Sequence, residues 1–397
     1  MTMTRRIAFL LTCIFSFCLH ATAHAATSPV PSAATARIIP AAPELNARAW
    51  ILIDARTGHV ITEHNADHQE APASLTKMLT TYIASERLKA GELHWDDMVP
   101  ISEKAWRTGG SKMFVKVGTK VSLKDLMLGI IVDSGNDAAV ALSQYIAGSE
   151  DAFADLMNQT AASLGMSHSH FVNATGLPVE GHYSTPRDLA TLARAIIYNH
   201  PEDYKLYSEK DFTYNGIHQA NRNTLLWRDP DVDGIKTGHT EQAGYCLVAS
   251  AKTDGTRLIS VVMGTPTNEA RLSESQKLLT YGFRFFQTAK SYAAKTTLME
   301  PRVWMGDADT VKVGNADDIY LTIPRGAAKD VKAELEVPDL LKAPITQGQQ
   351  LGTIKLTLDG NTLATRPLVA LNSVQEGGIF KRLWDWIILT VKGWFHH

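Results

Sequence analysis

Strand-like segments at both ends of a long helical region constrain the fold of this chain more than any other feature. Residues 50–54 and 59–63 are rich in strand formers and flank a turn, and residues 244–251 and 257–263 repeat this hairpin pattern. The region between the two hairpins has helical character up to about residue 200. Strands that flank helices in this way predict one antiparallel sheet to which both ends of the segment contribute.

Helical periodicity defines the layer that is expected to cover this sheet. Residues 123–131, 138–146 and 152–164 carry apolar side chains at helical spacing. Residues 188–197 follow Ser184-Thr185-Pro186, which is a typical cap and first turn. An aromatic and apolar stretch at 278–286 predicts the last helix. The fold class is therefore mixed α/β (α+β), with an antiparallel sheet covered by helices.

The sequence pattern changes at about residue 291. Short alternating runs at 319–323, 331–337 and 354–358 predict strands, and Asp359-Gly360 predicts a tight turn. These runs contain no cluster of titratable residues. The pattern indicates a separate small all-β domain that acts as a spacer or interaction module.

The last stretch, residues 379–395, predicts an amphipathic helix. Its expected apolar side carries Phe380, Leu383, Trp384, Ile387, Ile388, Val391, Trp394 and Phe395. Lys381, Arg382, Asp385 and Lys392 fall on the opposite side. Charges interrupt the apolar run too often for a spanning helix, so a helix lying in a membrane interface is favoured. A helix docked on its own domain is the alternative.

The amino terminus has the layout of a secretory signal. Arg5 and Arg6 precede an apolar run at 7–19, and Ala23-His24-Ala25 predicts cleavage after Ala25. An exported mature protein is therefore expected. Of the three cysteines only Cys246 lies outside this signal, so no intramolecular disulfide is predicted.

Composition indicates a globular chain of several domains. The 397 residues are 45% hydrophobic and 20% charged, which is enough to bury a large core. A formal net charge of −2 gives no basic field, so nucleic acid is not an expected partner. The predicted segments are a signal peptide at 1–25, a flexible leader at 26–43, a catalytic domain at 44–290, a small β-rich domain at 291–376 and a membrane-anchoring amphipathic helix at 377–397.

A serine and a lysine three residues apart, Ser74 and Lys77, could carry nucleophilic chemistry. Pro72 and the apolar spacing that follows it place them at the start of a helix, where they are neighbours. The helix amino terminus would stabilise negative charge that develops on Ser74. Lys77 could remove the serine proton only if its pKa were lowered. By itself the pair favours a different interpretation, a helix cap followed by a solvated lysine, so the other motifs must decide.

Two further motifs supply the remaining chemistry. Ser134-Gly135-Asn136, in a loop between two helical stretches, can present a second hydroxyl and a side-chain amide. Lys236-Thr237-Gly238 precedes the strand at 244. Its glycine would let a substrate backbone approach closely, while Lys236 and Thr237 would supply donors for an anion.

In this order, inside an exported chain, the three motifs resemble those of the penicilloyl-serine transferases, which include penicillin-binding proteins and serine β-lactamases. Longer strings make the resemblance narrower, and it covers nearly the whole chain. They are Ser-Gly-Asn-Asp-Ala at 134–138, Asn221-Arg222-Asn223, Asp233-Gly-Ile-Lys-Thr-Gly-His-Thr240, Gly244-Tyr245 and Ile319-Tyr-Leu-Thr-Ile-Pro-Arg-Gly326. With them the chain resembles the low-molecular-mass D-alanyl-D-alanine carboxypeptidases of the penicillin-binding protein 5 and 6 type.

This resemblance implies a function and a set of roles. Ser74 would attack the carbonyl between two D-alanines at the end of a peptidoglycan stem peptide, and penicillin would acylate it. Lys77 would take its proton. Ser134, relaying from Lys77 or Lys236, would protonate the leaving nitrogen. The oxyanion hole would be formed by the backbone amides of Ser74 and His239.

The resemblance also implies how the substrate is held and where the protein works. Asn136 would orient the substrate amide. The residues expected to bind the terminal carboxylate are Lys236, Thr237, Gly238, His239, Arg222 and Arg271. The implied location is the periplasmic face of the bacterial inner membrane, with peripheral attachment.

Other readings lead to different expectations. A β-lactamase would need a Glu-x-x-Leu-Asn pattern near 170–182, which is absent from the sequence. An endopeptidase on peptide crosslinks uses the same serine chemistry and stays open, and a wall-binding scaffold would predict a broken motif. A serine–histidine scheme lacks a Gly-x-Ser-x-Gly elbow. His168 and His170 have no third ligand at suitable spacing, so neither metal nor cofactor is expected.

Overall fold

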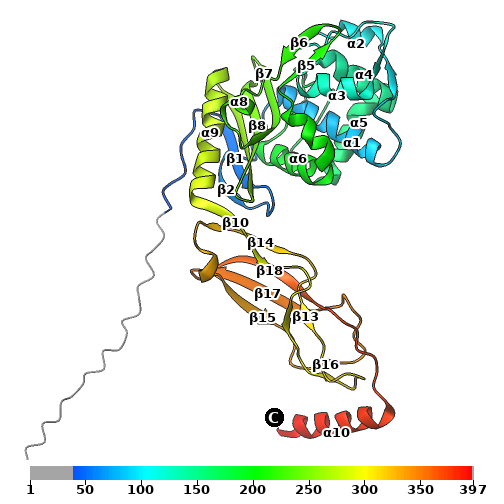
Figure 1. The fold of residues 1–397 in the computed structure, drawn as a ribbon, viewed down its shortest axis with the longest axis vertical. Coiled ribbons are helices and arrows are strands. Elements are labelled where there is room, and N and C mark those ends of the chain that lie inside the picture. Colours follow the sequence, from blue (N-terminus) through cyan, green and yellow to red (C-terminus); the bar gives the residue numbers. More distant parts are fainter. Residues whose placement is uncertain (1–38, 396–397) are drawn as a thin grey trace, which may run out of the picture. The chain divides into compact units, whose positions relative to one another are not determined.

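The computed structural model describes residues 39–395, with side chains described as far as residue 392. The predicted signal peptide, most of the predicted leader and the side chains of Trp394 and Phe395 lie outside the described residues. Figure 1 shows a mixed helix and strand region, a β-rich region and a terminal helix in chain order. The predicted α+β fold class is confirmed.

The first domain is built on one five-stranded sheet. Every neighbouring pair of strands in it is antiparallel. In spatial order the strands are β2 (Val60–His64), β1 (Ala49–Asp54), β9 (Thr256–Thr265), β8 (Gly244–Thr253) and β7 (Val232–Thr240). Strands from both ends of the segment therefore meet in one sheet, as the flanking hairpins predict.

Both faces of this sheet are buried. On β9, Ile259 and Val261 pack into one core with side chains of the helical layer, while Leu258 and Val262 pack into a second core on the other face. This alternation follows from the two-residue period of a strand. Helices therefore cover both faces, and Figure 1 shows α9 on one side of the sheet and the larger helical layer on the other.

The helical layer follows the predicted segments closely. Its elements are η1 (Ala73–Thr76), α1 (Lys77–Lys89), α2 (Glu103–Arg107), α3 (Leu123–Ile131), α4 (Asn136–Ala147), α5 (Glu150–Ser163), α6 (Pro186–Asn199), α7 (Pro201–Tyr204) and η2 (Lys205–Ser208). The short helix α8 (Leu225–Arg228) packs into the second core instead. Two small hairpins accompany them, β3 (Met98–Pro100) with β4 (Lys120–Ser122) and β5 (Asp211–Tyr214) with β6 (Ile217–Ala220). Thr185 caps α6 by accepting a hydrogen bond from the Asp188 amide, and Pro186 occupies the first turn.

The closing helix is longer than the sequence predicts. The predicted helix begins at residue 278, whereas α9 spans Asn268–Phe285. Thr267 caps it, with its hydroxyl accepting from the Ala270 amide. The first turns are largely polar and lack clear periodicity, so the pattern could not define where the helix begins. The longer helix places Arg271 in its first turns.

The β-rich region contains its own core. A five-stranded sheet runs in the order β11 (Thr297–Met299), β13 (Val313–Gly314), β18 (Asn361–Ala370), β17 (Gln350–Leu358) and β15 (Lys332–Glu336). The remaining elements are β10 (Phe286–Tyr292) paired with β14 (Ile319–Pro324), β12 (Val303–Trp304) paired with β16 (Leu341–Lys342), and η3 (Ala328–Asp330). The strands predicted at 319–323, 331–337 and 354–358 are all present.

The terminal helix α10 (Ile379–Phe395) has the predicted bounds. Asp385 is buried and accepts a hydrogen bond from the Met305 amide at 2.7 Å. Lys381 pairs with Asp309 at 2.6 Å. The polar side of α10 is therefore docked on the β-rich region, and the large apolar side chains from Ile379 to Val391 include several that are exposed.

Candidate active site

The turn that begins α1 brings Ser74 and Lys77 together. Ser74 lies in η1 and Lys77 is the first residue of α1. Lys77 is fully buried, and its Nζ lies 2.8 Å from Ser74 Oγ. The same nitrogen donates to the Thr175 carbonyl oxygen at 2.7 Å. Lys77 is therefore held against the serine and is not a solvated surface lysine.

A glycine lets the loop that carries the Thr175 carbonyl approach this turn. Gly176 has a φ of +84°, and a Cβ added there would lie 1.7 Å from the Ala73 carbonyl oxygen. A side chain at this position would therefore push the loop away from Ser74 and Lys77. Because Thr175 acts through its backbone, its residue type gives no signal of this contact in the sequence.

A second serine–lysine pair faces the first. Lys236, on β7, is almost fully buried and its Nζ donates to Ser134 Oγ at 3.0 Å. Ser134 lies in the loop between α3 and α4 and has a φ of +59°, an uncommon backbone conformation for a residue with a side chain. The structure thus brings each predicted hydroxyl into contact with one predicted amine, Ser74 with Lys77 and Ser134 with Lys236.

Burial and nearby positive charges make both amines easier to deprotonate. The pKa of Lys77 is lowered to about 7, mainly by burial and then by the positive charge of Arg222, while Asp137 opposes the shift. The pKa of Lys236 is lowered well below its usual value, again mainly by burial and then by the charge of Lys77. An uncharged amine beside Ser74 is thus accessible at neutral pH.

Asn136 lies at the start of α4, and within the described residues only the nitrogen of its side-chain amide is hydrogen-bonded. Its Nδ2 donates to the Gly109 carbonyl oxygen at 2.7 Å. Its Oδ1 is buried and has no hydrogen-bond partner among the residues that the structure describes. A buried acceptor without a partner is costly, so a donor at this oxygen would be stabilising.

A cavity of about 210 Å³ opens in front of these groups. It is lined by Ser74, Ser111, Ser134, Arg222, Thr237, Gly238, His239, Tyr245 and Arg271. Lys77, Asn136 and Lys236 lie behind this lining. The structure therefore gathers all the sequence-predicted site residues, and it adds Ser111 and Tyr245 to the lining.

One end of the cavity is rich in positive charge. Arg271, on α9, is buried and its Nη1 donates to the Gly238 carbonyl oxygen at 3.1 Å. Its guanidinium lies 5.5 Å from the centre of the Tyr245 ring, and that ring stacks on His239 at 3.9 Å. Burial lowers the pKa of Arg271 to about 10. Together with Arg222, this end suits a carboxylate ligand.

Gly238 serves the fold in a way that the sequence does not predict. A Cβ at this position would lie 2.9 Å from the Pro72 carbonyl oxygen and 3.3 Å from the Ala73 side chain. The glycine therefore permits β7 to lie against the turn that carries Ser74. The expected close approach of a substrate backbone would come in addition to this packing.

Asp133, next to Ser134, is a buried titratable group that sequence reasoning missed. Its Oδ1 has no hydrogen-bond partner in the described part of the chain. Burial, followed by the negative charge of Asp137, raises its pKa to about 7, against the pull of Arg222 and Lys236. No motif marks this residue, because its environment arises only when α4 and β7 meet.

Comparison with known proteins places the chain in a family. Residues 36–267 match the family described as D-alanyl-D-alanine carboxypeptidase, and residues 286–376 match the C-terminal domain of penicillin-binding protein 5. D-alanyl-D-alanine carboxypeptidase DacC of Escherichia coli is 45% identical over 373 residues, which cover 92% of this chain and 93% of that protein. DacA of Haemophilus influenzae is 47% identical over 359 residues, covering 89% and 91%.

Solved structures agree with the sequence comparison. Penicillin-binding protein 5 from Haemophilus influenzae matches with a TM-score of 0.82 at 45% identity, over 85% of this chain and 100% of that one. Penicillin-binding protein 6B from Escherichia coli matches with a TM-score of 0.71 at 38% identity, over 84% and 98%. The chain belongs to the D-alanyl-D-alanine carboxypeptidase family of penicillin-binding proteins.

Proposed function

We propose that this carboxypeptidase removes the terminal D-alanine from peptidoglycan stem pentapeptides through an acyl-enzyme on Ser74. The observation that carries the proposal is the contact of 2.8 Å between Ser74 Oγ and the buried Lys77 Nζ. A hydroxyl beside an amine that can be uncharged is an activated nucleophile. The family to which the chain belongs is named for the same reaction.

Acylation begins with proton transfer from Ser74 to Lys77. With its pKa lowered to about 7, Lys77 is available as a base at neutral pH. Ser74 Oγ bonds to the carbonyl carbon of the penultimate D-alanine, and the carbonyl oxygen becomes an oxyanion. Backbone amides of Ser74 and His239 stabilise it. Because β7 is an edge strand of the sheet, no further strand of residues 39–395 occupies its outer side.

Departure of D-alanine requires a proton on its nitrogen. Ser134 supplies it, since its hydroxyl contacts the Lys236 amine at 3.0 Å. The proton lost by Ser134 is replaced from the lysines behind it. The unpartnered Oδ1 of Asn136 accepts a hydrogen bond from the substrate amide and fixes the peptide for attack.

The positive end of the cavity selects a substrate with a free carboxylate. Arg222, Arg271 and the Thr237 hydroxyl surround the position of the last D-alanine, with His239 beside them. Water then hydrolyses the acyl-enzyme and releases the shortened peptide. Penicillin, which also carries a carboxylate beside its reactive carbonyl, acylates the same serine. No cofactor takes part in these steps.

We also propose that the protein is exported and attached to the periplasmic face of the inner membrane through α10. Phe380 is 89% exposed and Ile379 is 81% exposed, and Trp384 lies further along the same helix at 65%. Because the polar side of α10 contacts the β-rich region, these apolar side chains point away from that region. Among the described residues, no helix has the length and apolar character needed to span a bilayer.

The reaction is tested by incubating the mature protein with a pentapeptide that ends in D-Ala-D-Ala and assaying free D-alanine. Release is expected, and the Ser74→Ala variant should release none. Ser163→Ala, which alters an exposed serine of α5, is the matched control and should match the wild type. Absence of release by the wild type would favour a wall-binding scaffold. Release from crosslinked peptide dimers alone would favour an endopeptidase.

A further inference from the structure

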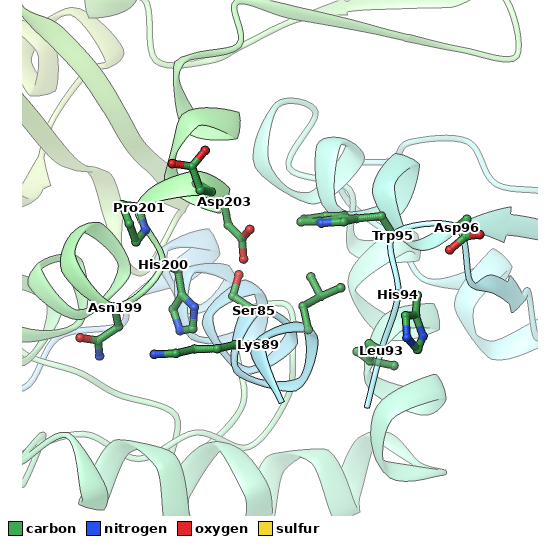
Figure 2. Close-up of a pocket in the computed structure, with 12 residues that line it drawn as sticks. Ser85, Lys89, Leu93, His94, Trp95, Asp96, Asn199, His200, Pro201 and Asp203 are labelled. Atoms are coloured by element: carbon green, nitrogen blue, oxygen red, sulfur yellow. The ribbon is translucent and has the colours of Figure 1, made fainter. Parts of the chain in front are cut away.

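A second cavity, separate from the active site, lies beside the carboxyl-terminal half of α1. Its volume is about 590 Å³, compared with about 210 Å³ for the active-site cavity, and the two share no lining residue. Its walls come from α1, from residues 93–96 and from residues 199–203. Figure 2 shows side chains from all three segments around one open space.

Ser85 presents its hydroxyl to this cavity. The residue is only 4% exposed, and its side chain has no hydrogen bond to any described residue. A serine within a helix commonly bonds a carbonyl of the preceding turn, and Ser85 does not. Figure 2 shows its side chain pointing from α1 into the space between Asp203 and Trp95. A hydroxyl in the wall of a cavity that has no protein partner is free to bond a polar ligand.

The cavity continues past Trp95 as a groove. An adjoining cavity of about 320 Å³ shares Trp95, Glu202 and Asp203 with the first and adds Lys124 and Leu206. The indole of Trp95 therefore borders both spaces. A ligand that fills this groove is elongated and passes over an aromatic side chain.

The groove contains charged side chains of both signs that have no partner within the described residues. Asp96, Asp203, Lys89 and Lys124 make no side-chain hydrogen bond or ion pair within residues 39–395. Carboxylates alone beside an indole would suit a cationic ligand. With amines of opposite charge in the same groove, the site offers donors and acceptors without a dominant sign.

We infer that this groove is a binding site for a glycan chain. A sugar ring has an apolar face of C–H groups that packs on an indole, and a rim of hydroxyls that both donate and accept hydrogen bonds. Trp95 supplies the surface on which a sugar ring would stack, and Ser85 and Asp203 supply polar partners for its hydroxyls. Leu88 and Leu93 form an apolar wall that would contact substituents other than hydroxyls. The elongated shape fits several linked rings.

The groove and the active site are joined by one rigid element. Ser85 lies two turns beyond Lys77 on α1, about 12 Å along the helix axis at 1.5 Å per residue. The stem peptide is carried by a glycan polymer, so a glycan site would hold the enzyme on its polymeric substrate. This consequence rests on the proposed function, but the binding site itself does not.

The test is titration of the full-length mature protein with a β-1,4-linked tetramer of N-acetylglucosamine, followed by calorimetry. Saturable binding is expected. Trp95→Ala should weaken it about tenfold or more, while Trp95→Phe, which keeps an aromatic face, should weaken it less. Ser85→Ala should weaken it about threefold, the loss of one hydrogen bond. Trp227→Ala, which removes an exposed indole outside the groove, is the matched control and should bind normally.

Several outcomes would overturn the inference. They are absence of saturable binding by the wild type, equal binding by Trp95→Ala, and binding of a lysine tetramer in place of the sugar tetramer. Thermal unfolding of each variant shows whether it is folded, and Trp95→Phe keeps the test valid if Trp95→Ala is not. D-Alanine release from the soluble pentapeptide should be unchanged in Trp95→Ala, so failure of glycan binding is distinguishable from failure of the proposed reaction.

Discussion

Lys236 Nζ lies 3.0 Å from Ser134 Oγ, which repeats in a second pair the contact of 2.8 Å between Lys77 Nζ and Ser74 Oγ. Burial lowers the pKa of both lysines most, and the charge of Arg222 lowers that of Lys77 further, as the charge of Lys77 does for Lys236. One pair can therefore accept a proton while the other supplies one. This division of roles suits a reaction in which a nucleophile loses a proton and a leaving group gains one.

Acylation by a fluorescent penicillin should depend on pH through Lys77. The uncharged amine is the base, and its pKa is lowered to about 7, so the rate of acylation at saturating penicillin should fall about tenfold per unit below that pH. Replacing Arg222 with Gln removes a charge that lowers this pKa, so the midpoint should move to higher pH. Stopped-flow measurements between pH 5 and pH 9 would check both. A flat profile, or a midpoint that moves to lower pH in the variant, would contradict this role of Lys77.

Arg271→Lys should weaken recognition of the terminal carboxylate. The shorter, non-planar amine cannot keep the bond to the Gly238 carbonyl and face the carboxylate together. A loss of about 2 kcal/mol, or roughly 30-fold in kcat/KM, is expected for a charged hydrogen bond. Lys252→Arg, a change on an exposed stretch of β8, serves as a control. Equal losses on a substrate whose terminal carboxylate is amidated would show that Arg271 acts elsewhere.

Gly176→Ala should break the hydrogen bond between Lys77 Nζ and the Thr175 carbonyl oxygen. The added Cβ would lie 1.7 Å from the Ala73 carbonyl oxygen, so the loop must move. Gly165→Ala is a matched control, since Gly165 has a φ of +79° but nothing within 4 Å of an added Cβ. Both variants should lose about 1 kcal/mol from the positive φ, and Gly176→Ala should lose at least another 1 to 2 kcal/mol and most of its acylation rate. Urea unfolding that gives the same loss for both would refute the packing explanation.

Exposed side chains of α10 should govern binding to lipid. Changing Phe380 and Trp384 together to Ser removes two of its exposed aromatic rings, so sedimentation with anionic phospholipid vesicles should fall about tenfold or more. Changing Lys329 and Lys332, on the β-rich region, to Ser is a charge-removing control that should have a small effect. Deleting residues 379–397 should abolish vesicle binding. Persistent association of the deleted form would place the contact elsewhere.

Sequence patterns predict the elements of this fold well where the periodicity is strong. The bounds of α3 and α10 match the predicted segments, because apolar residues recur at helical spacing along the whole helix. The start of α9 is wrong by ten residues, from the predicted 278 to 268, since its first turns are polar and their burial depends on the neighbouring sheet. Local pattern carries no information about such tertiary burial.

The candidate site also contains some residues that the sequence predicts and others that it does not. Ser74, Ser134 and Lys236 could be selected from sequence because their side chains act and their motifs resemble a known family. The Thr175 carbonyl could not, since it acts through its backbone. Asp133 could not either, because its raised pKa arises from burial and from charges that are distant in sequence. The groove beside Trp95 is assembled from three separate segments, and no motif marks it.

Esterification of Ser74 is the step on which the proposed reaction depends most directly. Penicillin should be trapped on the mature protein, the adduct digested, and the modified peptide sequenced by mass spectrometry. A penicilloyl group is expected on Ser74 and none on Ser111 or Ser134, which line the same cavity. An adduct on either of those serines, or retained labelling of the Ser74→Ala variant, would contradict the proposed reaction.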